Sequence, residues 1–506
     1  MDSHDRAVAQ IAATIRKFHA RKEKFRIYHG STNSTRQSQY QRDRMVDTST
    51  LNHVLKIDTK SMTALVEPNV AMDALVEATL QHGLLPPVVM EFPGITVGGG
   101  FAGTAGESSS FKYGFFDRTI NCIEVVLADG DVIKASATEN SDLFYGAASS
   151  FGTLGVTTLL EIQLVEAKTY VELDYHPVTS IAEAQTVIAK ATEDTTTDYL
   201  DGIMYSKDYG VMCVGRLMNE VSPGSKIQRF TRPTDPWFYI HVERLMKNRK
   251  SPAKESVPVV DYLFRYDRGG FWVARYAFKY FITPFNRITR FILDYFMHTR
   301  VMYHALHQSG LSSYYIIQDV AIPYKEAETF MSYLDTNFKH YPIWLCPLKQ
   351  SGKQIASTHS LQVQKTNQQR PEMMLNFGVW GPGPTRREDF IQWNRAFEKK
   401  VDALGGQKWL YAHTYYTEEE FDEIYDREKY DALREKYNAT YLPSVYDKVK
   451  VDVEKEQSAR EASWKARLVA LFWSIWPLMG LYGVYKAMMG GDYLLPKTKK
   501  KAAKDA

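Results

Sequence analysis

Glycine is concentrated in one short stretch of this chain, and that stretch limits how the region can fold. Residues 94–108 read GITVGGGFAGTAGES, in which six of the fifteen positions are glycine and five more are alanine, serine or threonine. Glycine loses more conformational entropy on folding than any other residue, so such a concentration indicates a use. Successive glycines expose backbone N–H groups and let the main chain approach a ligand closely. The stretch therefore favours either a loop that binds a phosphate or pyrophosphate, or a tight turn packed under other backbone.

A Rossmann dinucleotide-binding motif is the first alternative to consider for this stretch. The spacing from Gly98 to Gly103 matches GxGxxG, but that fingerprint needs a strand directly before it and a helix after it. Pro86, Pro87 and Pro93 precede the stretch, and proline interrupts a central strand. The surroundings therefore argue against a Rossmann domain.

The residues around the glycine stretch predict an α+β unit over residues 20–168. Alternating apolar residues, helical spacing and turn residues predict its elements in order. These are two strands in 53–67, a helix in 70–82 that Gly83 ends, a hairpin in 123–136 around Asp129-Gly130, a capped helix opening at NSDLFYGAASS, and a glycine turn, FGTLG at 151–155, that leads into a strand. The first thirty residues predict an amphipathic helix and carry no secretory signal.

The amino-acid composition of the chain changes from residue 169 onward. Glycine becomes sparse, and residues 235–305 are dense in aromatic residues and arginine. Residues 415–467 are charged and helical in pattern, with capping acids in TEEEFDEIYD. We predict an α+β fold with these segments: 1–168, a nucleotide-binding domain; 169–450, a substrate or cap domain; 451–467, a charged helical linker; 468–489, a membrane segment; and 490–506, a basic tail.

The C-terminal apolar run is the basis for the membrane segment. Residues 468–485 carry no charge, and eighteen residues of helix span roughly 27 Å, just enough for the hydrocarbon core of a bilayer. Pro477, Gly480 and Gly483 weaken a straight span, so a buried helix or a helix lying in the membrane interface stays open.

Bulk composition excludes several classes of protein. A net charge of +3 over 506 residues argues against nucleic-acid binding. The cysteines, Cys122, Cys213 and Cys346, are far apart, so we expect neither a disulfide framework nor a metal site. The oligomeric state cannot be inferred from these features.

The order of the elements resembles the FAD-binding domain of the vanillyl-alcohol-oxidase or PCMH type. Further motifs resemble one family, the delta-24-sterol reductases, in order from about residue 25 to 450: ITVGGGFAGTAGESSSFKYGFF, ENSDLFY, GTLG, PWFYIHVE, IIQDVAIP, YPIWLCP and LYAHTYYTEEEF. This resemblance implies an FAD enzyme on the endoplasmic reticulum membrane that uses NADPH to reduce the sterol side-chain double bond between carbons 24 and 25. Animal members carry an apolar segment before the FAD domain, whereas this chain begins almost at the domain and carries its apolar segment at the other end. The position of the anchor therefore cannot be taken from the family, and we predict it in residues 468–489. The catalytic domains are then expected in the cytosol, with sterol and membrane lipid as partners.

The resemblance also implies which residues hold FAD. They are Thr96, Val97, Gly98, Gly99, Gly100, Phe101, Ala102, Gly103, Thr104, Ala105, Gly106, Glu107, Ser108, Gly152, Thr153, Leu154 and Gly155. Covalent attachment in the wider superfamily often uses a histidine beside a glycine. Here His29 precedes Gly30 and Ser31 follows, from which we infer non-covalent FAD. A structural interpretation of Glu107 and Lys112 is an ion pair that holds the glycine stretch.

Alkene reduction requires a proton donor, and the sequence leaves it unassigned. Tyr411, His413 and Tyr415 are candidates, because tyrosine and histidine can move protons and LYAHTYYT is a polar cluster in an apolar frame. An isolated alkene also needs a dry, aromatic-lined pocket, for which the aromatic-rich second domain is suited. The alternatives are an FAD-dependent alcohol or sugar-acid oxidase of the same fold, and a membrane scaffold that has lost its flavin.

Overall fold

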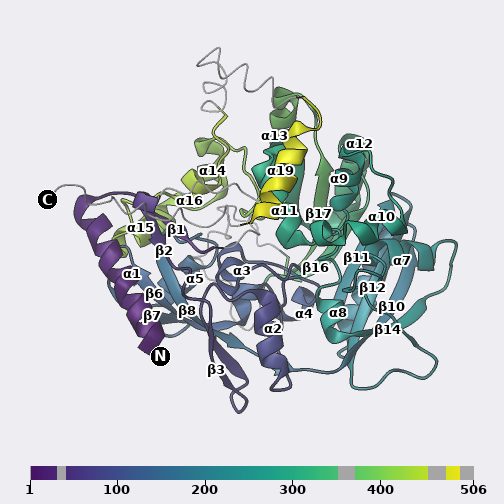
Figure 1. The fold of residues 1–506 in the computed structure, drawn as a ribbon, viewed down its shortest axis with the longest axis horizontal. Helices are drawn as coiled ribbons and strands as arrows, with labels where there is room; N and C mark the ends of the chain where they lie inside the picture. Colours follow the sequence, from purple (N-terminus) through teal and green to yellow (C-terminus); the bar gives the residue numbers. More distant parts are fainter. Residues whose placement is uncertain (1, 31–41, 352–370, 454–474, 491–506) are drawn as a thin grey trace.

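Two β-sheets organise the molecule, one from the N-terminal third of the chain and one from residues 170–408 (Figure 1). The structure is a computed structural model that describes residues 2–30, 42–351, 371–453 and 475–490. The first sheet has five antiparallel strands in the order β3-β4-β8-β6-β7. Their bounds are β3 (Val54–Asp58), β4 (Thr63–Val66), β6 (Ile120–Leu127), β7 (Val132–Ser136) and β8 (Gly155–Gln163).

Helices and two small strand pairs complete the first part. The strand pairs are β1 (Arg26–Tyr28) with β2 (Met45–Asp47), and β5 (Leu84–Leu85) with β9 (Val165–Glu166). The helices are α1 (Asp2–Arg21), α2 (Met72–Leu80), α3 (Val97–Gly103), α4 (Ser110–Tyr113) and α5 (Ser141–Ala147). The strand pair in 53–67, the helix in 70–82 and the hairpin in 123–136 are confirmed. Gly130 has a φ of +92°, the left-handed conformation for which the turn needs glycine.

The second sheet has nine strands, all paired antiparallel except β13 with β14. Their order is β13-β14-β10-β12-β11-β16-β17-β15-β18. The bounds are β10 (Tyr170–Val178), β11 (Tyr199–Ser206), β12 (Tyr209–Met218), β13 (Lys226–Ile227), β14 (Ala253–Pro258), β15 (Tyr315–Pro323), β16 (Ile343–Lys349), β17 (Met373–Pro382) and β18 (Gln407–Lys408).

Both faces of this second sheet are buried, so alternate side chains enter different cores. On β11, Leu200 and Met204 join an apolar cluster with three helices, while Tyr199 and Ile203 join the opposite cluster. The three helices are α6 (Ile181–Glu193), α12 (Ala327–Asn337) and α13 (Arg387–Ala403). Further helices are α7 (Phe238–Met246), α8 (Val259–Leu263), α9 (Ala274–Tyr280), α10 (Arg287–Ile292) and α11 (Thr299–Gln308).

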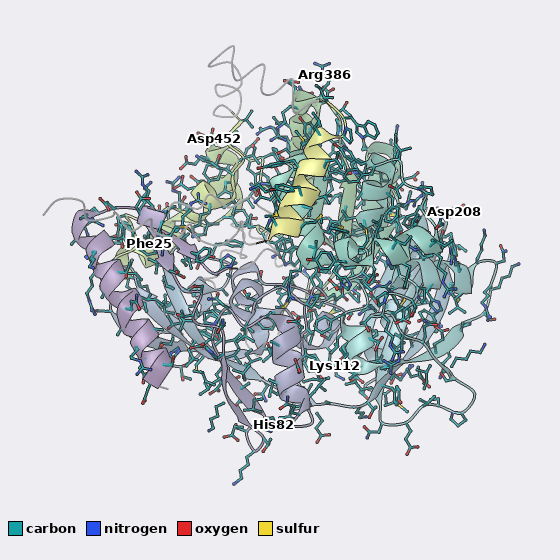
Figure 2. All side chains as sticks on the ribbon, in the orientation of Figure 1. Phe25, His82, Lys112, Asp208, Arg386 and Asp452 are labelled. Carbon is teal, nitrogen blue, oxygen red and sulfur yellow. The ribbon has the colours of Figure 1, made fainter. Side chains whose placement is uncertain are left out.

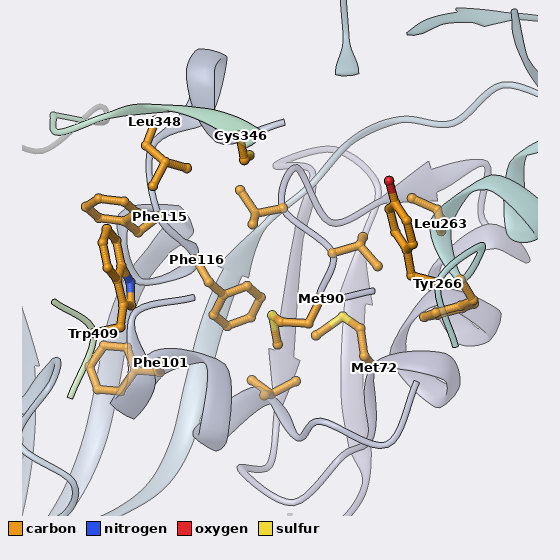
Figure 3. Close-up of a cluster of buried hydrophobic side chains, with 14 of the residues drawn as sticks. Met72, Met90, Phe101, Phe115, Phe116, Leu263, Tyr266, Cys346, Leu348 and Trp409 are labelled. Atoms are coloured by element: carbon orange, nitrogen blue, oxygen red, sulfur yellow. The ribbon is translucent and has the colours of Figure 1, made fainter. Parts of the chain in front are cut away.

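The opposite cluster joins the two parts of the molecule. Met90, Phe101 and Phe116 from the first part lie in the same buried cluster as Tyr266 and Cys346 from the second (Figure 3). Because this apolar core is continuous, it fixes the two sheets relative to each other and shapes whatever lies between them.

The segment after the second sheet returns to the first part. Its helices are α14 (Glu418–Ile424), with the predicted acidic cap, α15 (Arg427–Lys436) and α16 (Val445–Val449). Ala439 and Leu442 lie in one apolar cluster with the buried face of α1, which confirms that α1 is amphipathic. Residues 439–442 thus pack on the domain at the start of the chain. The division into domains at residue 168 stays a prediction.

The predicted C-terminal membrane helix is wrong, and the fold is corrected accordingly. Within the described parts of the chain, no helix is both long and apolar enough to cross a bilayer. The helix that forms, α19 (Leu478–Met489), has twelve residues and begins after Pro477. Its glycines face neighbouring protein: a Cβ on Gly483 would lie 2.5 Å from the carbonyl oxygen of Ala305 on α11. Residues 468–474 lie outside the described residues. Location on the endoplasmic reticulum stays a prediction.

Candidate functional site

A cavity of about 440 Å³ lies between the two parts and is lined by residues of both. The first part contributes the glycine stretch, the turn at 151–155 and residues near β1. The second part contributes mainly aromatic side chains and Asp319. A second cavity among the described residues, beside Gln407 and Leu410, holds about 10 Å³. A concave, mostly apolar pocket with a few converging polar groups is the usual form of a cofactor or substrate site.

The glycine stretch is helical at its centre, whereas the sequence predicts a loop. Thr96 caps α3 by accepting a hydrogen bond from the N–H of Gly99 at 3.1 Å. The helix ends at Thr104, which has a φ of +50°. Glycine is a poor helix former, so this turn of helix depends on its cap and its packing rather than on propensity.

The glycines of α3 divide into two groups by what surrounds them. A Cβ on Gly98 would lie 2.8 Å from Pro68 Cβ, and one on Gly100 would clash with the side chain of Met90. A Cβ on Gly103 would meet nothing closer than Tyr411 at 3.8 Å, and Gly103 lines the cavity. Gly98 and Gly100 are therefore needed for packing, while Gly103 leaves space that a ligand can use.

Most of the residues expected to hold FAD line this cavity. They are Thr96, Gly98, Gly99, Gly100, Phe101, Ala102, Gly103, Ala105, Gly106, Glu107, Gly152, Leu154 and Gly155. Four do not line it: Val97, Thr104, Ser108 and Thr153. Val97 is buried in the apolar core, and the other three make hydrogen bonds that hold the frame.

The returning C-terminal segment fixes the second glycine turn. Gly152 has a φ of +72°, and a Cβ there would clash with the side chain of Ile27. The hydroxyl of Tyr430 donates to Thr153 Oγ1 at 2.6 Å, and Lys448 Nζ donates to the carbonyl of Phe151 at 2.6 Å. The turn is thus braced by residues almost three hundred positions later in the chain.

One end of the cavity is basic. Arg26, His29 and Lys448 line it beside the turn at 151–155. Burial, and then the charge of Lys448, lower the pKa of His29, so His29 is mainly neutral at pH 7 and can donate or accept a hydrogen bond. Cations beside exposed backbone N–H groups suit a pyrophosphate.

The other end is aromatic and carries buried carboxyl groups. Arg265 is fully buried, and its Nη2 lies 2.9 Å from both Glu91 Oε1 and Asp201 Oδ2. Glu91 lines the cavity, and its Oε2 has no hydrogen-bond partner among the described residues. Burial raises the pKa of Glu91 to about 8, against the opposing charge of Arg265, so this carboxyl group is mostly protonated at pH 7.

Asp319 and Tyr411 form a hydrogen-bonded pair in this aromatic end. The hydroxyl of Tyr411 donates to Asp319 Oδ2 at 2.6 Å, and Trp380 Nε1 donates to the same oxygen at 3.2 Å. Asn376 Nδ2 donates to Oδ1 at 3.3 Å. Burial raises the pKa of Asp319 to about 6, although these three hydrogen bonds oppose the shift. Asp319 can therefore take up and release a proton near neutral pH.

Comparison with known proteins connects this geometry to a family. Residues 6–136 match the FAD binding domain family. Delta(24)-sterol reductases from Macaca fascicularis and Homo sapiens are each 31% identical over 461 residues, covering 88% of this chain and 86% of theirs. The enzyme from Pisum sativum is 31% identical over 456 residues, covering 82% of this chain and 78% of its own. This chain belongs to the delta(24)-sterol reductase family.

The residues of this delta(24)-sterol reductase fit FAD. The open side of Gly103 provides the close backbone approach that a flat ring or a phosphate requires. The basic end around Lys448 suits the pyrophosphate. At the aromatic end, Glu91 Oε2 is a buried polar atom that lacks a partner in the protein, and a polar ring edge could supply one.

The structure brings only one of the three proton-donor candidates into the cavity. Tyr411 lines it, whereas His413 and Tyr415 do not. The carbonyl of His413 accepts from Lys408 Nζ at 2.5 Å, and the backbone of Tyr415 bonds to Glu398 and Arg395, so these two residues belong to the frame behind the site.

The ion pair between Glu107 and Lys112 that the structural interpretation would require is not formed. Lys112, at the junction of the two parts (Figure 2), donates to Asp198 Oδ1 at 2.9 Å instead. Glu107 lines the cavity, where burial and the nearby Glu91 raise its pKa. Lys112 thus links the glycine stretch to the second sheet and leaves Glu107 in the site.

Sequence reasoning missed Glu91 and Asp319. Each is a single acidic residue in an apolar run, MEFP and IIQDVAIP, and an acid in a buried strand or loop is costly unless it has a partner or a function. That signal was available. What the sequence could not supply was the partner, because Asp319 meets Tyr411 across ninety-two positions.

Proposed function

We propose that this protein reduces the double bond between carbons 24 and 25 of a sterol side chain, with NADPH as the reductant and FAD held non-covalently in the central cavity. Family membership supports an FAD-dependent sterol reductase. The observation that carries the proposal is a cavity that is basic beside the turn at 151–155 and aromatic, with buried acids, around Asp319 and Tyr411. FAD, when bound, supplies hydride transfer from NADPH to one alkene carbon.

The chain itself must supply a proton, because an isolated alkene is a poor hydride acceptor. In the proposed step the Tyr411 hydroxyl gives its proton to the other alkene carbon, while Asp319 in its acid form gives a proton to the tyrosine oxygen. Tyr411 thus stays neutral, and Asp319 ends as a carboxylate that water re-protonates. When Asp319 is protonated, the 2.6 Å hydrogen bond can reverse its direction, and the tyrosine hydroxyl can then direct its own hydrogen toward the substrate.

Besides the proton supply, the reaction requires that water be excluded, and the aromatic side chains that line the cavity have this role. Phe271, Tyr303, Trp344 and Trp380 line the cavity and are each less than a tenth exposed. As the proton adds, positive charge develops on the carbon that awaits hydride, and aromatic faces stabilise a cation without adding a nucleophile. Water at that carbon would give an alcohol instead of the reduced side chain.

Glu91 is the second candidate for the proton donor. It lies in the same cavity, is mostly protonated at pH 7 and has a free oxygen, Oε2. The two candidates differ in pKa, about 6 for Asp319 and about 8 for Glu91, so the pH dependence of the reaction separates them.

The test begins with the cofactor. Purified protein should be yellow, and acid precipitation should leave the flavin in the supernatant. Flavin that stays with the pellet would overturn the non-covalent assignment. Colourless protein that cannot be reconstituted with FAD would support the flavin-less scaffold.

The second arm of the test separates the two enzyme classes. With NADPH and a panel of delta-24 sterols, NADPH should be oxidised and the sterols should gain two mass units. Oxygen consumption with alcohols or sugar acids, without sterol reduction, would instead support an oxidase of the same fold.

A further inference from the structure

Exposed apolar side chains gather in two segments that are distant in sequence. Of the fifteen large apolar side chains that are strongly exposed among the described residues, twelve lie in residues 282–295 and 475–489. Surface apolar residues are normally scattered, and a contiguous group marks an interaction site. We call this group the α10–α19 face: Ile282, Phe285, Ile288, Phe291, Ile292, Tyr295, Ile475, Trp476, Leu481, Tyr485, Met488 and Met489.

Helix α10 exposes apolar side chains and buries a charged one, which is the reverse of a helix on a water-facing surface. Ile288, Phe291 and Ile292, at helical spacing on one side, are 70%, 52% and 69% exposed. Arg290, by contrast, is buried, and its guanidinium lies 5.6 Å from the ring centre of Trp237 and 4.9 Å from that of Phe285. A helix in water places isoleucine inside and arginine outside, so the reversed arrangement indicates an apolar environment outside.

Helix α19 shows the same reversal. Its buried residues are the small ones, Gly480, Gly483 and Ala487, while Leu481 and Met488 are more than half exposed. Small residues that allow close backbone packing, with large apolar residues pointing outward, are typical of helices that meet lipid.

The two helices adjoin through the end of α9. Trp476 Nε1 donates to the carbonyl of Tyr280 at 2.7 Å, and the Tyr280 hydroxyl accepts from the N–H of Gly480 at 3.3 Å. Ile282, which is 75% exposed, comes two residues after Tyr280 and begins the segment that leads into α10. The end of α9, followed by the exposed Ile282, thus links the two helices.

The charges on the α10–α19 face indicate which kind of partner can bind it. Residues 269–295 and 475–489 contain one acidic residue, Asp294, which is buried and paired with Arg268. Arg275, Lys279 and Arg287 are exposed there, and no carboxylate of the described residues pairs with them. A second copy of the chain would place like charges against like, whereas anionic lipid headgroups would neutralise them.

We propose that the α10–α19 face docks the protein on an anionic lipid bilayer, with the two helices lying in the headgroup boundary. The face also adjoins the site: α11 contacts α19 through Ala305 and Ser309, and the same helix carries Tyr303, which lines the cavity. A sterol dissolved in the bilayer would thus enter beside α11. That route rests on the proposed function, whereas docking on lipid does not.

Vesicle co-sedimentation of the full chain tests the proposal. Wild-type protein should pellet with phosphatidylcholine vesicles that contain about 30% phosphatidylserine, and less with phosphatidylcholine alone. Ile288→Asp with Ile292→Asp, and separately Leu481→Asp with Met488→Asp, should each lower the partition coefficient by about tenfold or more. Ile227→Asp is the matched control, because Ile227 is 53% exposed but lies outside the face, and it should leave binding unchanged.

Two results would overturn the proposal. One is unchanged vesicle binding when both double substitutions are combined, which would assign binding to another part of the chain. The other is a wild-type dimer in sedimentation velocity that the substitutions convert to monomer while lipid binding is absent throughout, which would make a second copy the occupant. Flavin content and reduction of detergent-solubilised sterol, measured in the same variants, keep this test separate from that of the proposed function.

Discussion

At the scale of single residues, Asp319 and Glu91 are two buried carboxyl groups whose pKa values burial raises to different extents. The proton donor must hold its proton, so activity is full below the donor's pKa and falls as the pH rises through it. If Asp319 supplies the proton through Tyr411, kcat/KM for sterol reduction should fall above about pH 6. A fall that begins only near pH 8 would assign the role to Glu91. The pH profile of the wild-type enzyme makes this choice, and Asp319→Asn should remove the limb near pH 6.

Tyr411 is the residue whose hydroxyl the proposed step requires. Tyr411→Phe keeps the ring and removes the proton donor, so kcat should fall by roughly 10²–10⁴-fold with flavin content unchanged. Tyr303→Phe is the matched control, because Tyr303 lines the same cavity and, among the described residues, donates no hydrogen bond to Asp319. Equal loss of activity in both variants would contradict the assignment.

Prediction from sequence at this scale was only partly possible. A polar cluster in an apolar frame indicated Tyr411, and the glycine density indicated a ligand near Gly103. Nothing in the cluster distinguished Tyr411 from His413. The chain turns at Tyr411 and Ala412 instead of continuing as a strand, so only the fold decides which side chain meets the cavity.

At the scale of elements, the glycines of the seven-residue helix α3 have two different roles. Gly98 and Gly100 pack against protein, whereas Gly103 faces the cavity. Gly103→Val should therefore leave the protein folded and abolish flavin retention, because the branched side chain fills ligand space. Gly98→Val should instead lower the thermal midpoint of the protein, because its side chain would overlap Pro68. The flavin-to-protein ratio and the melting temperature are measured on both. Normal flavin content in the Gly103 variant would refute the role of α3.

The turn at 151–155 depends on α15 in the same way. Tyr430 donates to Thr153 Oγ1, and its hydroxyl oxygen accepts from the N–H of Val445 at 3.1 Å. Tyr430→Phe removes both hydrogen bonds and leaves the buried N–H of Val445 without the tyrosine oxygen, so the free energy of unfolding should fall by about 1–3 kcal/mol. Tyr295→Phe, at an exposed hydroxyl, should change it by less than about 0.5 kcal/mol. Denaturant titration of both variants checks this, and equal stability would show that Tyr430 does not brace the turn.

Elements with a strong local signal were predictable. The Asp129-Gly130 hairpin and the cap of α14 formed as expected, because turn geometry and capping depend on neighbours in sequence. Helix α3 was not predictable, since its glycines oppose a helix and its stability comes from Pro68 and Met90.

At the scale of the whole molecule, the C-terminal region differs most from expectation. An uncharged run of eighteen residues satisfied the length criterion for a membrane span, yet its described part is a short helix packed on α11. Hydropathy counts apolar residues without distinguishing which side of a helix they occupy, and here the small residues face the protein. Likewise, no local pattern indicated that residues 439–442 return to α1.

The central claim concerns the whole molecule, because residues of both parts line the cavity. The first part is proposed to hold the cofactor, and the aromatic side chains of the second part are proposed to exclude water from the substrate. A single-turnover experiment under anaerobic conditions tests it most directly. Purified flavin-loaded protein is mixed with one equivalent of NADPH and a delta-24 sterol, and the flavin spectrum and the sterol mass are followed together. Our account predicts that NADPH bleaches the flavin absorbance, that the sterol restores it, and that one sterol gains two mass units for each NADPH consumed. Bleaching that the sterol does not reverse, with the side-chain double bond intact, would contradict it.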